Sequence, residues 1–252
     1  MGRPGDREPS GIWQRDGKQA LAVACATLAV ELGAYAGAMA AGANQRDATL
    51  AALATATVWV ALAAGAMAAG ARDALGALLR GGVVADASAV TLLALWLAGP
   101  YLTFVAVVKV YCLLACMALA GAAAAHLPAR PAGRSAAAIV AAIAFLALLT
   151  TPLWCGGLLT AMEGSARETA VRWAVAVNPF YGVTAAVVER TGFVWHYGAV
   201  MYHLTPIGDY AAPPPMPWYA SAWRVALVAV LLALAKLAIA RRRARHQPLL
   251  LR

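Results

Sequence analysis

Apolar and polar segments alternate along this chain, and the apolar segments are long. Six of them are separated by polar links, at residues 19–42, 49–71, 83–99, 102–126, 135–159 and 220–240. A helix needs about 20 residues to cross a hydrocarbon core of ~30 Å. The pattern therefore predicts an all-α, polytopic integral membrane protein with six transmembrane helices.

One long region, residues 163–219, is neither apolar enough to span a membrane nor a terminal tail. It opens with Ser165 and, three residues later, Glu168, the spacing of a capping box that starts a helix. The amphipathic run that follows stops at Asn178-Pro179, because a proline disfavours helix in the residue before it. A second short helical run comes next, and then a polar segment rich in Trp and Tyr. We expect short helices here, between the fifth and sixth spans.

The composition indicates a single membrane domain. The chain is 63% hydrophobic and 12% charged, whereas soluble chains carry about a quarter charged residues. Residues 19–240 form the six-helix domain, between a tail at 1–18 and a basic tail at 241–252. The first apolar run, of ~24 residues, is longer than the apolar core of a cleaved signal peptide, so we expect an uncleaved first span.

The placement of the basic residues predicts the orientation. With the N-terminus inside, thirteen Lys and Arg residues lie in inner segments and four in outer segments, and such residues collect on the cytoplasmic side. We expect both termini in the cytoplasm, a bacterial-type inner membrane, and an extracytoplasmic 163–219 region. The net charge of +9 forms no stripe with interleaved aromatics. Membrane lipid is therefore an expected partner and nucleic acid is not.

Two charges lie deep within the predicted spans. Glu31 is near the middle of the first span, and Lys109 lies eight residues after Tyr101, about 12 Å into the fourth. Such residues are candidates for a direct role in transport. Two structural interpretations stay open as well. Glu31 and Lys109 could form a neutral pair that fixes helix packing, or Lys109 could extend to the interface.

Other candidates within the spans are small or soft side chains. Gly33 and Gly37 would let a neighbouring helix approach the first span closely. Cys112 and Cys116 share one helical face inside an apolar run, which favours packing over a soft-metal site.

Imidazole and thioether groups that could bind copper lie in the outer region, at His196, Met201 and His203. Their spacing is not that of a tight site, so we predict no metal and no cofactor.

The link between the second and third spans, residues 72–82, is short, basic at both ends and apolar on one side. Two interpretations stay open: a surface helix that docks on a partner, or a turn with positive anchors. The residues that would carry docking are Arg72, Asp73, Leu75, Leu78 and Arg80.

Enzyme motifs are absent. The chain has no His-Glu-x-x-His, no Gly-x-Ser-x-Gly and no phosphate-binding loop. We therefore predict no enzymatic activity, with an intramembrane enzyme centred on Glu31 or on the His–Met group as a minor alternative. If ATP drives this protein, another chain binds it.

Together these features resemble the membrane subunit of ABC-2 type transporters. Such subunits have six spans with cytoplasmic termini, and an inner coupling helix between spans two and three. They also have an outer insertion of short helices between spans five and six, often with an Asn-Pro followed by an aromatic residue. The chain matches this insertion at Asn178, Pro179, Phe180 and Tyr181, with Glu189 near the end of the following helix.

The resemblance implies a permease subunit of an exporter, energised by a separate ATPase chain that docks on residues 72–82. It also implies pairing with a second membrane subunit, identical or different. The alternative from another class is a membrane-embedded assembly or scaffold protein without transport activity. Its outer aromatic region would bind another protein.

Overall fold

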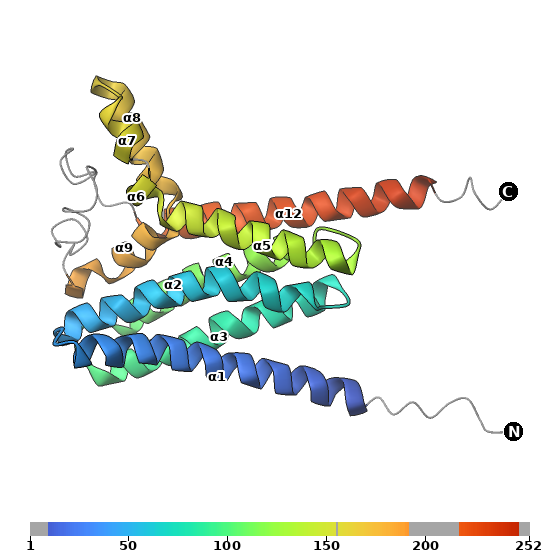
Figure 1. Ribbon diagram of the computed structural model, residues 1–252, viewed down its shortest axis with the longest axis horizontal. Coiled ribbons are helices and arrows are strands. Elements are labelled where there is room, and N and C mark those ends of the chain that lie inside the picture. The colour runs from blue at the N-terminus through green and yellow to red at the C-terminus, as the bar shows by residue number, and fades with distance from the viewer. Residues whose placement is uncertain (1–9, 155, 192–216, 247–252) are drawn as a thin grey trace, which may run out of the picture.

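The computed structural model describes residues 10–154, 156–191 and 217–246, and every regular element within them is a helix (Figure 1). The chain begins with α1 (Ser10–Ala40), α2 (Gln45–Ala69), α3 (Ala74–Ala98), α4 (Phe104–Ala125) and α5 (Pro131–Leu149). It continues with α6 (Thr151–Trp154), α7 (Gly156–Thr160), α8 (Gly164–Val177), α9 (Pro179–Thr191) and α12 (Trp218–His246). Six of these, α1 to α5 and α12, are long and apolar enough to cross a membrane. The predicted all-α polytopic membrane fold is confirmed.

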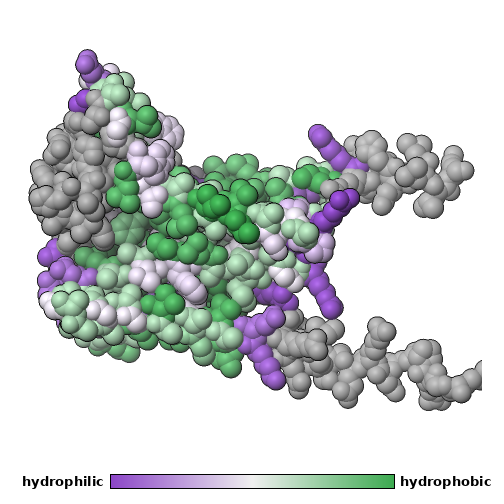
Figure 2. Space-filling model, in the orientation of Figure 1, coloured by the Kyte–Doolittle hydropathy of each residue, from purple (hydrophilic) through white to green (hydrophobic). Residues whose placement is uncertain are grey.

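The centre of the bundle is α4. The helices α2, α3, α5, α9 and α12 pack against it, whereas α1 packs against α2 and α3. The start of α1, the α2–α3 turn and the end of α12 lie at one end of the bundle (Figure 1). Hydrophilic groups gather at this end, while hydrophobic residues cover the sides (Figure 2). We call it the basic end, after Arg72, Arg130, Arg134, Arg241 and Arg242.

Side-chain caps set the starts of several spans. Asn44 Oδ1 accepts a hydrogen bond from Asp47 N at 2.9 Å before α2, and Thr103 Oγ1 accepts from Ala106 N at 3.1 Å before α4. Each cap satisfies an amide of the first turn, which has no partner within its own helix. The second and fourth spans therefore begin within a few residues of their predicted positions. The first and sixth extend further toward the basic end than their apolar patterns predict.

The third span begins earlier than predicted. The apolar pattern places its start at residue 83, but α3 begins at Ala74. Asp73 is the N-cap, and its Oδ1 accepts from Gly76 N at 2.6 Å. Residues 74–82 are thus the first turns of a membrane span. Of the two interpretations of this link, the turn is the one observed, over residues 70–73, and no separate surface helix lies between spans two and three.

The fifth span ends earlier than predicted. Its apolar pattern continues to residue 159, but α5 stops at Leu149, and α6 and α7 turn away from the bundle (Figure 1). Pro152 explains the break, because it has no backbone N–H to donate to the carbonyl of Leu148. Thr151 Oγ1 donates to that carbonyl instead, at 2.7 Å.

Glycine allows α2, α3 and α4 to approach closely. A Cβ added at Gly81 of α3 would lie 2.9 Å from Ala122 Cβ of α4, and one at Gly65 of α2 would lie 3.4 Å from Gly121 O of α4. By contrast, no atom lies within 4 Å of a Cβ at Gly33 or Gly37. The predicted close approach at α1 is therefore wrong within the described chain, and the tight crossings lie around α4.

Candidate functional site

The predicted docking residues lie at the basic end. Arg72 and Asp73 are exposed in the turn before α3, and Leu75, in its first turn, is 68% exposed. Leu79, one turn further along the same face, is 65% exposed, although the sequence did not single it out. Arg80 differs, because its Nη1 would lie 3.1 Å from a Cβ on Gly70, over the end of α2.

Leu78, the remaining predicted docking residue, is 37% exposed. The structure therefore gathers two charged side chains and exposed leucines around one turn at the end of the bundle. Large exposed apolar side chains at such a position are typical of a protein interface when charged groups surround them.

A second polar group at the basic end ties four parts of the chain together. Lys236 Nζ of α12 donates to both the carbonyl oxygen and Nδ1 of His126, the C-cap of α4. Arg134 of α5 donates from Nη1 to the carbonyl of Ala71, and from Nε to Pro128 O at 3.4 Å. Burial, with the neighbouring charges of Lys236 and Arg134, holds the pKa of His126 below its ordinary value. His126 is thus a neutral acceptor.

At the opposite end, Asn178 connects two helices. Its Nδ2 donates to Leu149 O, at the end of α5, at 3.0 Å, and its Oδ1 accepts from Phe180 N, at the start of α9, at 2.9 Å. The side chain is fully buried. The predicted helix break at Asn178-Pro179 is confirmed, and the asparagine amide caps the end of α5 and the start of α9.

The rest of the predicted outer motif lies close by. Tyr181 is buried against Leu159 and Val171, which joins α9 to α7 and α8. Pro179 is buried and Phe180 is partly buried. The side chain of Glu189 lies outside the described residues. So do the predicted His196, Met201 and His203 group and most of the outer aromatic segment.

Inside the span region, Glu31 is fully buried where α1 meets α3. Its Oε1 accepts from Ser88 Oγ at 2.5 Å, and its Oε2 has no hydrogen-bond partner. The hydrogen-bond partner of this carboxylate is therefore Ser88 and not Lys109, so of the interpretations left open, the Glu31–Lys109 pair is wrong. Lys109 is partly buried on α4.

Further polar contacts support the same region. Thr27 of α1 is fully buried and accepts from Trp59 Nε1 of α2 at 2.9 Å. On the other side of α3, Tyr111 Oη of α4 donates to Asp86 Oδ1 at 2.8 Å. Asp86 is exposed near the middle of α3. The apolar pattern, which starts the third span at residue 83, would instead leave Asp86 near the edge of that span.

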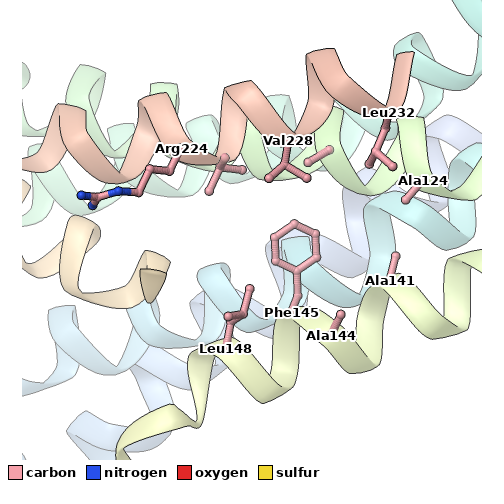
Figure 3. Close-up of a pocket in the computed structure, with 10 residues that line it drawn as sticks. Ala124, Ala141, Ala144, Phe145, Leu148, Arg224, Val228 and Leu232 are labelled. Carbon is pink, nitrogen blue, oxygen red and sulfur yellow. The ribbon is translucent and has the colours of Figure 1, made fainter. Parts of the chain in front are cut away.

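An apolar groove of about 340 Å³ runs between α5 and α12, over a floor formed by α4 (Figure 3). Phe145 and Leu148 of α5 and Val228 and Leu232 of α12 point into it from opposite walls (Figure 3). The other lining residues are Ala120, Ala124, Ala141, Ala144, Arg224 and Val225. Arg224 lies at one end, and its Nη1 donates to Ala176 O at 2.8 Å.

Comparison with protein-family models, with curated proteins and with solved structures finds no match. The architecture itself defines the class: an all-α, multi-pass membrane protein with six spanning helices and a set of short helices between the fifth and the sixth.

Proposed function

We propose that this chain is the membrane-spanning permease subunit of an ABC-type exporter of the ABC-2 kind, energised by a separate ATPase chain. The observation that carries the proposal is the surface around the α2–α3 turn. There, Arg72 and Asp73 flank the exposed Leu75 and Leu79 at the basic end. A soluble partner can reach the turn and Leu75 at the tip of the bundle, and an exposed leucine beside charged residues suits protein docking.

The basic end faces the cytoplasm in this proposal, because membrane proteins keep their excess of Lys and Arg on that side. The membrane is then a plasma membrane of the bacterial type, and α6 to α9 lie outside. Two such subunits, identical or different, form the transport unit, and nucleotide-driven motion of the ATPase moves their helices against each other.

The test is co-purification with a phosphate-loop ATPase encoded beside this chain. We expect Leu75→Asp, combined with Arg72→Glu, to abolish co-purification, because both changes disrupt the docking surface. Leu97→Asp is the matched control, since Leu97 is 77% exposed at the other end of the same helix. Equal recovery of the ATPase with both variants would reject this docking surface. A chain that never recovers an ATPase, but recovers another membrane-associated protein, would favour the scaffold alternative.

A further inference from the structure

The groove between α5 and α12 has two cations at its basic end, whereas a single arginine, Arg224, lies at its other end and donates to Ala176 O. On α12, Val228, Leu232 and Lys236 follow one another at four-residue spacing and so share one face. Lys236 therefore lies one turn beyond the end of the apolar wall. Its hydrogen bonds to His126 confirm this position, because His126 follows Ala124, which lines the groove floor.

The other wall of the groove has a matching cation. Arg134 precedes Ala141 on α5 by seven residues, about two helical turns, and so lies on the same side of the helix. Arg134 and Lys236 also contact the same short link, because Arg134 donates to Pro128 O and Lys236 donates to His126 O, two residues earlier. The basic end of the groove thus has one cation on each wall.

The described hydrogen bonds of these two cations all go to neutral acceptors. Lys236 donates to a backbone carbonyl and to the neutral imidazole of His126, and Arg134 donates to the carbonyls of Ala71 and Pro128. An ammonium has three N–H donors and a guanidinium has five, so each keeps donors for another acceptor. The sequences of α4, α5 and α12 contain no Asp or Glu, and one carboxylate from outside them, Asp73 of the α2–α3 turn, acts on His126. Lys236 and Arg134 outnumber it, so this end keeps a net positive charge. The end of the groove therefore attracts an anion.

We infer that this groove binds an acyl chain of an anionic phospholipid, whose phosphate lies between Lys236 and Arg134. From Lys236 to Arg224 the groove follows about 18 Å of helix, slightly more than half of a hydrocarbon core of ~30 Å. One leaflet's acyl chain therefore fits its length. Phosphate oxygens suit both cations, because charge-assisted hydrogen bonds to phosphate are strong.

A second copy of this chain is a poorer occupant. Docking through the same face would bring its own Lys236 and Arg134 toward those of the first copy, without acidic residues on α5 or α12 to pair with them. A zwitterionic lipid is a poorer occupant too, because its headgroup would place a third cation beside Lys236 and Arg134. The inference does not depend on the proposed function, since any protein with this groove would bind the lipid.

The test measures lipid retained by the purified full chain, using phosphatidylglycerol and phosphatidylcholine with identical acyl chains. Native mass spectrometry after exchange into detergent should show phosphatidylglycerol bound at least about tenfold more tightly. Lys236→Gln with Arg134→Gln should remove this preference. Arg241→Gln is the matched control, because Arg241 is exposed at the same end but lies beyond the groove.

A second variant tests the apolar part of the site. Ala144→Phe should fill the groove and lower retention of both lipids, and Ala144 is exposed, so the change leaves the core intact. Ile143→Phe is its control, since Ile143 is 60% exposed and does not line the groove. Equal retention of the two lipids by the unmodified chain, or full retention of phosphatidylglycerol by Ala144→Phe, would overturn the inference.

Discussion

Gly81 and Gly82 are neighbours on α3, yet a single methyl group at each should have opposite effects. A Cβ at Gly81 would lie 2.9 Å from Ala122 Cβ and 3.4 Å from the carbonyl oxygens of Ala118 and Ala64. A Cβ at Gly82 meets no atom within 4 Å. Gly81→Ala therefore forces α3 away from α2 and α4, whereas Gly82→Ala adds a methyl group in open space.

The magnitudes follow from two competing effects. Replacing a helical glycine by alanine stabilises a helix by about 0.5–1 kcal/mol, and both variants gain this. Overpacking a tight contact costs about 1–3 kcal/mol, and only Gly81→Ala pays it, because the methyl group of Ala122 has no rotatable bond by which to move aside. Gly81→Ala should therefore lower stability by up to about 2 kcal/mol, and Gly82→Ala should raise it by up to about 1 kcal/mol.

Thermal unfolding of the full chain in a mild detergent measures the difference. For a chain of this size, 1 kcal/mol corresponds to about 2–4 °C in Tm, so the two variants should differ by several degrees, with Gly81→Ala the lower. Both substitutions add the same group to adjacent positions, so each controls for the other. Equal shifts of the same sign would refute the close packing of α3 on α4 at Gly81.

Three further predictions concern the polar contacts. Glu31→Ala should destabilise the chain by about 1–3 kcal/mol, since a fully buried side chain and its hydrogen bond from Ser88 are lost, while Glu31→Gln should retain most of the stability; equal losses in an equilibrium unfolding titration would contradict this. Asn178→Ala should cost about 1–2 kcal/mol because two helix ends lose their cap, and Asn178→Asp, which keeps the acceptor for Phe180 but places a buried carboxylate oxygen against Leu149 O, should cost at least as much; an unchanged Tm in both would show that the caps do not matter. The pKa of folded His126 lies below its ordinary value of 6.5, so its contribution to stability is complete above that pH and is lost as the pH falls below it; the Tm should drop on acidification, and a drop of the same size in His126→Gln would assign it to other groups.

The number of spans was predictable, because it depends on apolar runs of sufficient length. The helix break at Asn178-Pro179 was predictable too, because a proline disfavours helix in the residue before it whatever the rest of the chain does. The start of the third span and the end of the fifth were misplaced, because there the hydropathy pattern and the local backbone chemistry indicate different helix limits. The start of α3 follows the cap at Asp73, although the next residues include charge and glycine. The end of α5 follows Pro152, although the apolar run continues past it.

The contacts between spans were less predictable, for a physical reason. They depend on how each helix is rotated about its own axis, and alanine-rich helices show little difference between their faces. Glu31 was a visible candidate, but its bond to Ser88 required knowing that α1 packs on α3. Lys236, a charge within the sixth apolar run, was not among the candidates, and its contact with His126 joins residues far apart in the sequence.

Half of the buried hydrophobic residues among those described are alanine, nineteen of thirty-eight. Alanine has no side-chain rotamers to restrict, so bringing these helices together costs almost no side-chain conformational entropy, in contrast to a core of leucine or methionine. The free energy gained by packing these helices is correspondingly small, because it comes from van der Waals contacts between backbones at short range. Assembly of this bundle should therefore be unusually sensitive to the thickness and lateral pressure of the surrounding bilayer, which change the spacing of whole helices.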